Sequence, residues 1–140
     1  MIAGMKVFLV ALALCVMPVH AADPATSDYE PGEVAAFAKK VQAALRARDV
    51  DGIIALSAMP LRVNLDKGKV RRLSREQLRR EFDRIFSPPI VKEVLDQDPE
   101  TLFENWQGVM FGSGAVWAAK PCESRGCTPT SLRIIVVNAK

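Results

Sequence analysis

The last third of the chain carries the pattern that most restricts the fold. Two apolar segments, residues 108–111 (GVMF) and 115–119 (AVWAA), are separated by residues 112–114 (GSG), a combination typical of a β-hairpin. Residues 131–138 (SLRIIVVN) are rich in β-branched side chains and predict a final strand. Strands joined by short connections pair antiparallel, so this region predicts an antiparallel sheet with a face that must be covered.

Helical periodicity precedes the hairpin. Residues 33–48 repeat apolar side chains at intervals of three and four, which predicts an amphipathic helix. We expect Asp51 to cap a short second helix that ends at Pro60. Residues 60–65 (PLRVNL) then alternate between apolar and polar side chains, as a half-buried strand does.

The clearest local signal is residues 73–86 (LSREQLRREFDRIF). Ser74 and Gln77 stand three apart, as in a capping box, and the apolar residues that follow form one stripe. Two prolines end this helix, and residues 90–95 are expected to add one or two turns. Helices followed by consecutive strands define an α+β fold, with the helices packed on one side of the sheet.

The N-terminus reads as an export signal. Lys6 precedes an apolar run of about 13 residues, too short for the roughly 20 that a membrane span needs. Val19-His20-Ala21 then resembles a cleavage site, so residues 1–21 are predicted to be a signal peptide, cut after Ala21 or Ala22. The organisation expected is a signal peptide (1–21), a flexible leader (22–32) and a single domain (33–140). A periplasmic or secreted location follows, and the chain is not expected to be an integral membrane protein.

Loss of the signal peptide removes the one histidine of the sequence, along with Cys15 and one of the 19 Lys and Arg residues. Without histidine there is no Ser-His-Asp or Cys-His arrangement and no usual zinc ligand set. No paired-carboxylate or cofactor motif replaces them. We therefore expect no metal, no cofactor and, on balance, no enzymatic activity, although a carboxylate with a shifted pKa remains an alternative.

Cys122 and Cys127 are the two remaining cysteines. An exported chain meets an oxidising compartment, and a gap of four residues suits neither the usual redox pair nor a four-ligand zinc site. The sequence predicts that they form a disulfide that staples the hairpin connection. The staple has two interpretations: a pinned turn, or a rigid recognition loop that is ordered before binding.

The order of these segments resembles the nuclear transport factor 2-like superfamily. The resemblance rests on RARDVDGIIAL, PLRVN, the helix ending in FDRIF, NWQGVMFGSGAVW and RIIVVN, and it spans roughly residues 33–138. It implies a cone: a strongly curved antiparallel sheet wrapped against the helices, with a pocket at the open end. Members include enzymes, ligand carriers and assembly modules. Enzymatic members use a pocket Asp with His or Tyr partners, and here the one tyrosine, Tyr29, lies in the leader.

Six residues are candidates to line such a pocket: Arg62, Asn64, Glu104, Trp106, Met110 and Trp117. Their apolar and aromatic side chains with a few polar groups suit a small apolar or amphipathic ligand, and a buried Glu104 is the candidate general base. The alternatives are core packing for Trp106, Met110 and Trp117, and a solvated or edge face for Arg62 and Asn64. The second functional hypothesis is a protein–protein interaction module, a homodimer or an inhibitor of a secreted enzyme. Cysteines at the same spacing close a loop in some periplasmic lysozyme inhibitors, to which this loop is similar. The arginines of residues 71–84 alternate with acids, so no nucleic-acid partner is expected.

Overall fold

The computed structural model describes residues 28–122, 125–126 and 131–140. Within these residues the chain forms four α-helices: α1 (Glu33–Arg46), α2 (Val50–Ala55), α3 (Arg75–Ile85) and α4 (Pro88–Asp96). It also forms six strands: β1 (Ser57–Asn64), β2 (Val70–Leu73), β3 (Phe103–Asn105), β4 (Gly108–Phe111), β5 (Val116–Ala119) and β6 (Arg133–Asn138). The predicted signal peptide, with Cys15, and the predicted disulfide partner Cys127 lie outside the described residues.

Helix α1 follows the predicted amphipathic pattern. Its inner side is closed to solvent, with Phe37 at 7% and Val41 at 0% exposure. The helix ends at Arg46 rather than at Arg48, because Arg48 has a left-handed φ of 49°. Such a conformation cannot continue a right-handed helix.

The predicted cap of α2 is wrong by two residues. Asp49, not Asp51, is the cap: its Oδ1 accepts a hydrogen bond of 2.9 Å from the backbone N–H of Gly52. A capping side chain must precede the first turn to reach its free N–H groups. Asp51 already lies inside that turn, where it forms an ion pair of 2.6 Å with Arg79.

Helix α3 begins with the predicted capping box. Ser74 Oγ accepts from Gln77 N at 3.3 Å, and Ser74 N donates to Gln77 Oε1 at 2.8 Å. Helix α4 begins earlier than predicted, at Pro88, because the first turn of a helix tolerates proline. The prolines therefore separate two helices and start the second.

The six strands form one sheet in the order β2-β1-β6-β5-β4-β3. The hairpin β4–β5 and the antiparallel pair β5–β6 are as predicted. The prediction of an entirely antiparallel sheet is wrong, because β1 and β6 pair in parallel. A parallel pair needs a long crossover, and this one contains β2, α3, α4 and the β3–β5 meander. The edge strands β2 and β3, which were not predicted, are short and largely polar.

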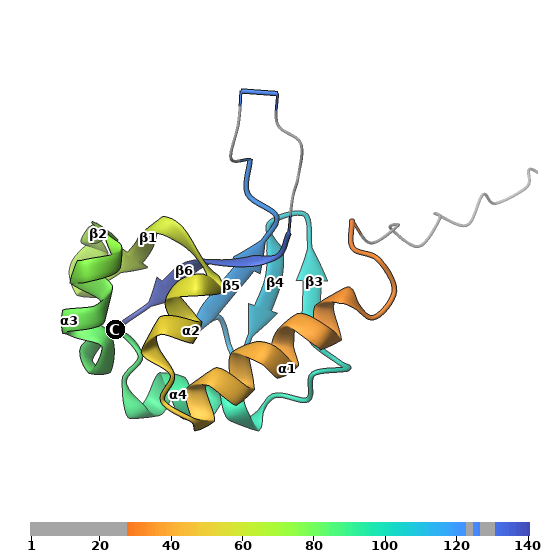
Figure 1. Ribbon diagram of the computed structural model, residues 1–140, viewed down its shortest axis with the longest axis horizontal. Helices are drawn as coiled ribbons and strands as arrows, with labels where there is room; N and C mark the ends of the chain where they lie inside the picture. Colours follow the sequence, from red (N-terminus) through yellow and green to blue (C-terminus); the bar gives the residue numbers. More distant parts are fainter. Residues whose placement is uncertain (1–27, 123–124, 127–130) are drawn as a thin grey trace, which may run out of the picture.

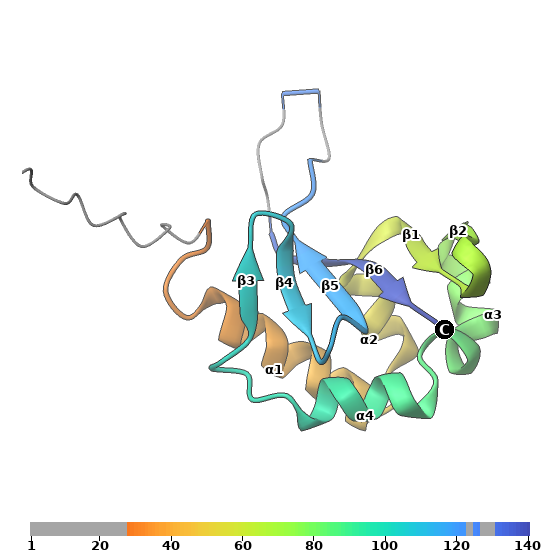
Figure 2. The same cartoon turned by 180° about the vertical axis from the view of Figure 1, so that it is seen from behind.

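The helices lie on one face of the sheet, as Figure 1 shows, and Figure 2 shows the opposite face from behind. The covered face is closed by side chains at 0% exposure on four adjacent strands: Leu61, Val63, Val109, Phe111, Val116, Ala118, Ile134 and Val137. Within the described part of the chain no helix covers the other face. We call it the open face, and it positions the candidate site.

Candidate functional site

The register of the strands aligns six side chains in one row across the open face. From β2 to β3 the row reads Arg72, Arg62, Val136, Trp117, Met110 and Phe103. None of the six is buried, and Phe103 is 53% exposed. We call this set the cross-strand row. It is cationic at one end and apolar along the remaining four strands.

A chain of hydrogen bonds holds Arg62 in place beside this row. Arg62 Nε donates to Asn64 Oδ1 at 3.0 Å, and Asn64 Nδ2 donates to Asn138 Oδ1 at 2.7 Å. Asn138 Nδ2 in turn donates to the carbonyl oxygen of Gly114 at 2.5 Å. Each amide is thereby oriented by its neighbour, so the guanidinium of Arg62 is held on the open face by two strands, β1 and β6, and by the turn between β4 and β5.

A shallow hollow of about 350 Å³ lies over the centre of the row. We call it the apolar hollow, and its lining residues are Arg62, Asn64, Gln107, Trp117, Ile135, Val136 and Asn138. A bulge in β6 widens its floor. Val136 pairs with Trp117 and Ile134 with Ala118, so Ile135 is the extra residue, and both Ile135 and Val136 line the hollow.

The structure brings four of the six predicted site residues together. Arg62, Asn64 and Trp117 line the apolar hollow. Met110 lies beside Trp117 on β4 and lines an adjoining hollow of about 470 Å³, which also includes Trp117 and Asn138. Prediction from sequence missed Gln107, Ile135, Val136 and Asn138; alternation along β6 was the available signal, and the bulge interrupts it.

Trp106 and Glu104 are placed elsewhere. Trp106 lies in the turn between β3 and β4 and is 87% exposed. Glu104 alternates with Phe103 on β3, and its charge acts on Tyr29. Neither residue lines the apolar hollow.

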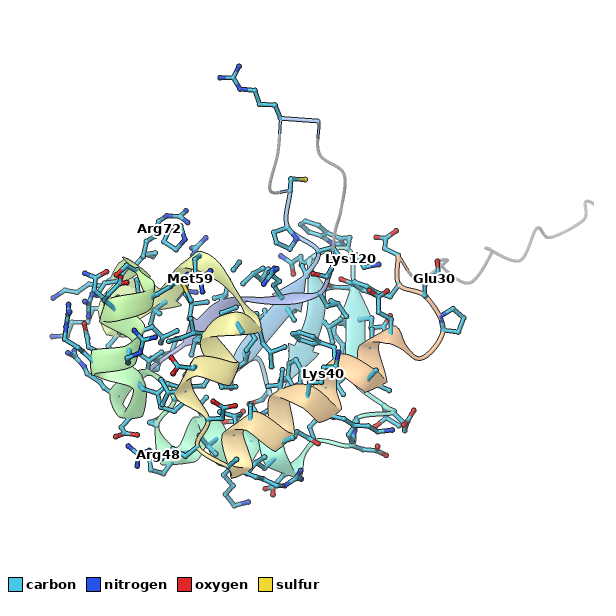
Figure 3. The ribbon with its side chains drawn as sticks, viewed as in Figure 1. Glu30, Lys40, Arg48, Met59, Arg72 and Lys120 are labelled. Carbon is cyan, nitrogen blue, oxygen red and sulfur yellow. The ribbon has the colours of Figure 1, made fainter. Side chains whose placement is uncertain are left out.

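The Tyr29 end of the molecule carries its own electrostatic cluster. Lys120 Nζ lies 2.8 Å from Glu33 Oε2 and 5.4 Å from the centre of the Tyr29 ring, and Figure 3 labels Lys120 and Glu30 toward this end of the molecule. Burial raises the pKa of Glu33, but hydrogen bonds from Lys120 and the N–H of Glu30 outweigh it, and the net pKa is lowered. Burial raises the pKa of Tyr29, as do the nearby carboxylates. This cluster joins the start of α1 to the end of β5.

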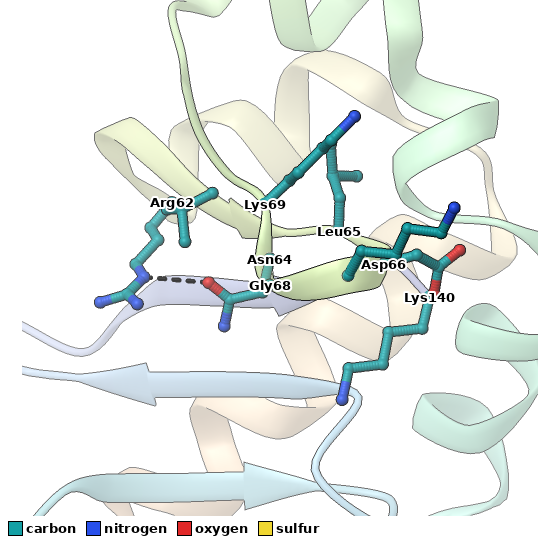
Figure 4. A pocket seen from close by; sticks show the side chains of 9 residues that line it. Arg62, Asn64, Leu65, Asp66, Gly68, Lys69 and Lys140 are labelled. Atoms are coloured by element: carbon teal, nitrogen blue, oxygen red, sulfur yellow. Dashed lines mark hydrogen bonds between the residues drawn. The ribbon is translucent and has the colours of Figure 1, made fainter.

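A second hollow, of about 430 Å³, adjoins the cationic end of the row. We call it the basic hollow; it is lined by Arg62, Asn64, Leu65, Asp66, Lys67, Gly68, Lys69, Val70 and Lys140. Figure 4 shows Lys69 and Lys140 extending on opposite sides of it, with Arg62 bonded to Asn64 at its end. It meets the apolar hollow at Arg62 and Asn64.

Four arginines on the helix side of the molecule, Arg48, Arg71, Arg79 and Arg84, have acidic partners. Arg71 donates from Nη1 and Nη2 to both carboxylate oxygens of Glu81 at 2.7 and 2.8 Å, which holds the pKa of Glu81 below its usual range. In contrast, Arg62, Arg72 and Lys69 form no ion pair with any residue that the structure describes. Arg62, Arg72 and Lys69 therefore carry positive charge on and beside the open face that no ion pair among the described residues compensates.

No protein-family model matches this chain, and neither a curated protein nor a solved structure matches it. The described residues contain no group of three or more His, Cys, Asp and Glu side chains placed to hold a metal ion. Over the same ranges, no helix has the length and apolar character needed to cross a membrane.

Proposed function

We propose that the chain is an exported, noncatalytic binding protein that takes a small amphipathic molecule on the open face of its sheet. One observation carries the proposal. Arg62, Asn64 and Trp117 come from two strands that are not adjacent, yet they line one hollow with an apolar floor. Small-ligand sites combine such a floor with a few oriented polar groups, and their volumes begin at about 300 Å³.

The proposal places the ligand on the open face because the covered face is filled by packed side chains. Phe111 and Ile134, which point toward the helices, have 0% exposure, so the space between helices and sheet is filled by side chains. The proposal thus differs from the enclosed cone pocket implied by the resemblance. Membership of the nuclear transport factor 2-like superfamily, and its cone shape, remain part of the proposal; the order of helices and strands supports them.

The chemistry of the apolar hollow supports binding rather than catalysis. Its lining offers a guanidinium, three side-chain amides, an indole and aliphatic groups. None of these is a general acid or base near neutral pH. Glu104, the candidate base, is exposed and lies outside the hollow.

The Cys122–Cys127 disulfide and the signal peptide belong to the same proposal. Cys122 follows the end of β5, and residues 125–126 project beyond the sheet in Figure 1. A disulfide here would pin the β5–β6 connection, as expected in an oxidising compartment. The mass of the protein purified from the envelope of the cells that make it tests both the disulfide and the signal peptide. We expect residues 1–21 to be absent and the mass to be two hydrogens below that of the reduced chain.

A partner protein on the same face is the second candidate. Phe103 and Trp106 are 53% and 87% exposed, and both lie beyond the apolar hollow. A small molecule along the cross-strand row would leave Trp106 uncovered, whereas a protein surface would cover both aromatic side chains.

Tryptophan fluorescence tests the proposal. In a Trp106→Phe protein, Trp117 is the one remaining indole, and it reports directly on the hollow. We expect saturable changes on titration with decyl maltoside or decyl phosphate below their micelle concentrations. Val136→Asn should weaken both by about tenfold, because it removes apolar floor. Val91→Asn is the matched control, because Val91 lies on α4, is half-buried like Val136 and lines neither hollow.

The outcomes separate the candidates. Saturable binding that Val136→Asn weakens and Val91→Asn preserves supports the proposal. If neither amphiphile changes Trp117 fluorescence, small-molecule binding on this face is refuted. A concentration-dependent dimer in sedimentation, abolished by Phe103→Ser, would then favour the interaction module.

A further inference from the structure

We propose that the ligand of the open face is an anionic amphiphile, held with its apolar chain along the cross-strand row and its oxyanion head group at Arg62 and Arg72. This inference rests on the proposed function and adds the chemical class of the ligand. It starts from the asymmetry of the row, which places two guanidinium groups on β2 and β1 and four apolar side chains on β6 to β3.

The two arginines are directly opposite each other. Arg62 pairs with Arg72 in the register of β1 and β2, so both side chains emerge on the same face, about 5 Å apart at their Cα atoms. Like charges in this arrangement destabilise a sheet. Neither guanidinium has a carboxylate partner among the described residues. An anion between them would remove the repulsion.

The neighbouring Arg71, in contrast, has its charge compensated by a carboxylate of the same chain. Arg71 alternates to the covered face, opposite Val63, and there it binds Glu81 through two hydrogen bonds. Arg72, one residue later, faces the open side, where the lining of the basic hollow adds Lys67, Lys69 and Lys140 and one acidic side chain, Asp66. The positive field on this side is therefore available to a ligand.

Arg62 is also oriented for an oxyanion. The hydrogen bond to Asn64 uses Nε, which leaves the pair of terminal nitrogens as donors. Two parallel N–H groups fit the two oxygens of a phosphate or carboxylate. Because two arginines face each other, a doubly charged phosphate monoester matches the site better than a singly charged carboxylate.

The apolar end of the row has the length of an alkyl chain. Adjacent strands are about 4.8 Å apart, so the distance from Val136 to Phe103 across three strand spacings is about 14 Å. The head group and the chain would then occupy opposite ends of one continuous surface. The apolar and basic hollows meet at Arg62 and Asn64, where the ligand would change from apolar to charged.

The test is a series of decyl compounds that differ in their head group, read by Trp117 fluorescence in the Trp106→Phe protein at low salt. The probes are decyl phosphate, decanoate, decyl maltoside and decyltrimethylammonium, with inorganic phosphate as the probe without a chain. We expect decyl phosphate to bind at least about tenfold more tightly than decyl maltoside, decanoate to fall between them, and the cation to bind most weakly.

Substitutions assign the effect to the arginine pair. Arg72→Gln should weaken decyl phosphate by about tenfold and leave decyl maltoside unchanged, because Arg72 contacts only the head group. Lys69→Gln should act in the same direction with a smaller effect. Arg46→Gln is the matched control: it removes an exposed arginine from the end of α1 and should change neither affinity. The melting temperature of the Arg72→Gln protein should not fall, since a repulsive pair is removed.

Three results overturn the inference. Equal affinity for decyl phosphate and decyl maltoside would refute the head-group preference while leaving the proposed function intact. Inorganic phosphate bound as tightly as decyl phosphate would show that the apolar row is not part of the site. An equal loss of decyl phosphate affinity in Arg46→Gln and Arg72→Gln would show a general charge effect. Absence of binding by every decyl probe would instead refute the proposed function itself.

Discussion

The contact between α1 and the end of α4 gives a sharp test of how this fold is held together. Gln42 is 3% exposed, and its Nε2 donates to the carbonyl oxygens of Val94 at 3.0 Å and Gln97 at 2.7 Å. These carbonyls belong to the last turn and the C-cap of α4, where the helix ladder runs out; Val94 O also accepts from the cap N–H of Gln97 at 3.4 Å. Gln42 therefore supplies both donors from a neighbouring helix.

Gln42→Glu keeps the shape of the side chain and replaces the donor by a second oxygen. When the new carboxyl is protonated it returns one donor, so one carbonyl loses its partner, at a cost of about 1–3 kcal/mol. When it is ionised, a buried negative charge faces two carbonyl oxygens. The folded state therefore raises the pKa of the introduced carboxyl above its unfolded value of about 4.3.

The sign of the pH dependence follows from this raised pKa. Below about pH 3 the group is protonated in both states, and only the lost hydrogen bond counts. As the pH rises, the unfolded state ionises first, and the free energy of unfolding falls by up to about 1.4 kcal/mol per pH unit relative to wild type. Between pH 4 and pH 7 we expect the penalty to grow by roughly 2–3 kcal/mol.

Urea unfolding followed by circular dichroism at several pH values measures this penalty. Gln42→Leu is the control, because it removes both donors without adding a charge. We expect it to cost about 2–4 kcal/mol at every pH. A Gln42→Glu penalty that is the same at pH 4 and pH 7, or a Gln42→Leu penalty within experimental error of zero, would refute the assignment of Gln42 as the donor that caps α4.

Three further substitutions test other parts of the fold. Gly108→Ala should destabilise the protein by about 2 kcal/mol or more in urea unfolding, because φ is 137° and a Cβ would lie 2.2 Å from the carbonyl oxygen of Ala118; an unchanged midpoint would refute the close approach of β4 and β5. Ser74→Ala should cost about 1 kcal/mol through loss of the capping box, and Ser74→Thr, which keeps the acceptor, should cost less. Arg71 lowers the pKa of Glu81, so the ionised carboxylate stabilises the fold above its unfolded pKa and loses that contribution as the pH falls through its folded pKa. The difference in unfolding free energy between wild type and Glu81→Gln should therefore shrink in acid. A difference that stays constant from pH 7 to about pH 3 would contradict this expectation.

Local signals in the sequence predicted those elements that depend on neighbours along the chain. The capping box at Ser74 needs only Gln77, three residues away, and the stripe of α1 needs only its own periodicity. The cap of α2 was misplaced because Asp49 and Asp51 are both good capping residues. Sequence alone does not say which one precedes the first turn.

The candidate site was predicted less completely, because it depends on register between distant strands. Alternation placed Arg62 and Asn64 on one side of β1, and the structure puts both in the apolar hollow with Trp117. The opposition of Arg62 and Arg72 depends on how β1 pairs with β2. Strand β2 was not predicted, because the short segment before Ser74 has no clear strand pattern. The bulge that adds Ile135 to the hollow is likewise a property of pairing between β5 and β6.

The position of β6 has a consequence for how the chain reaches its native state. It is the last of the six strands in sequence, yet it lies between β1 and β5. Before residues 133–138 are available, the ribbon β2–β1 and the meander β5–β4–β3 have no strand to join them, and each exposes an inner edge capable of pairing with another molecule. Completion of the sheet must therefore wait for residues 133–138, which makes a late, all-or-none closing step the expected kinetic signature.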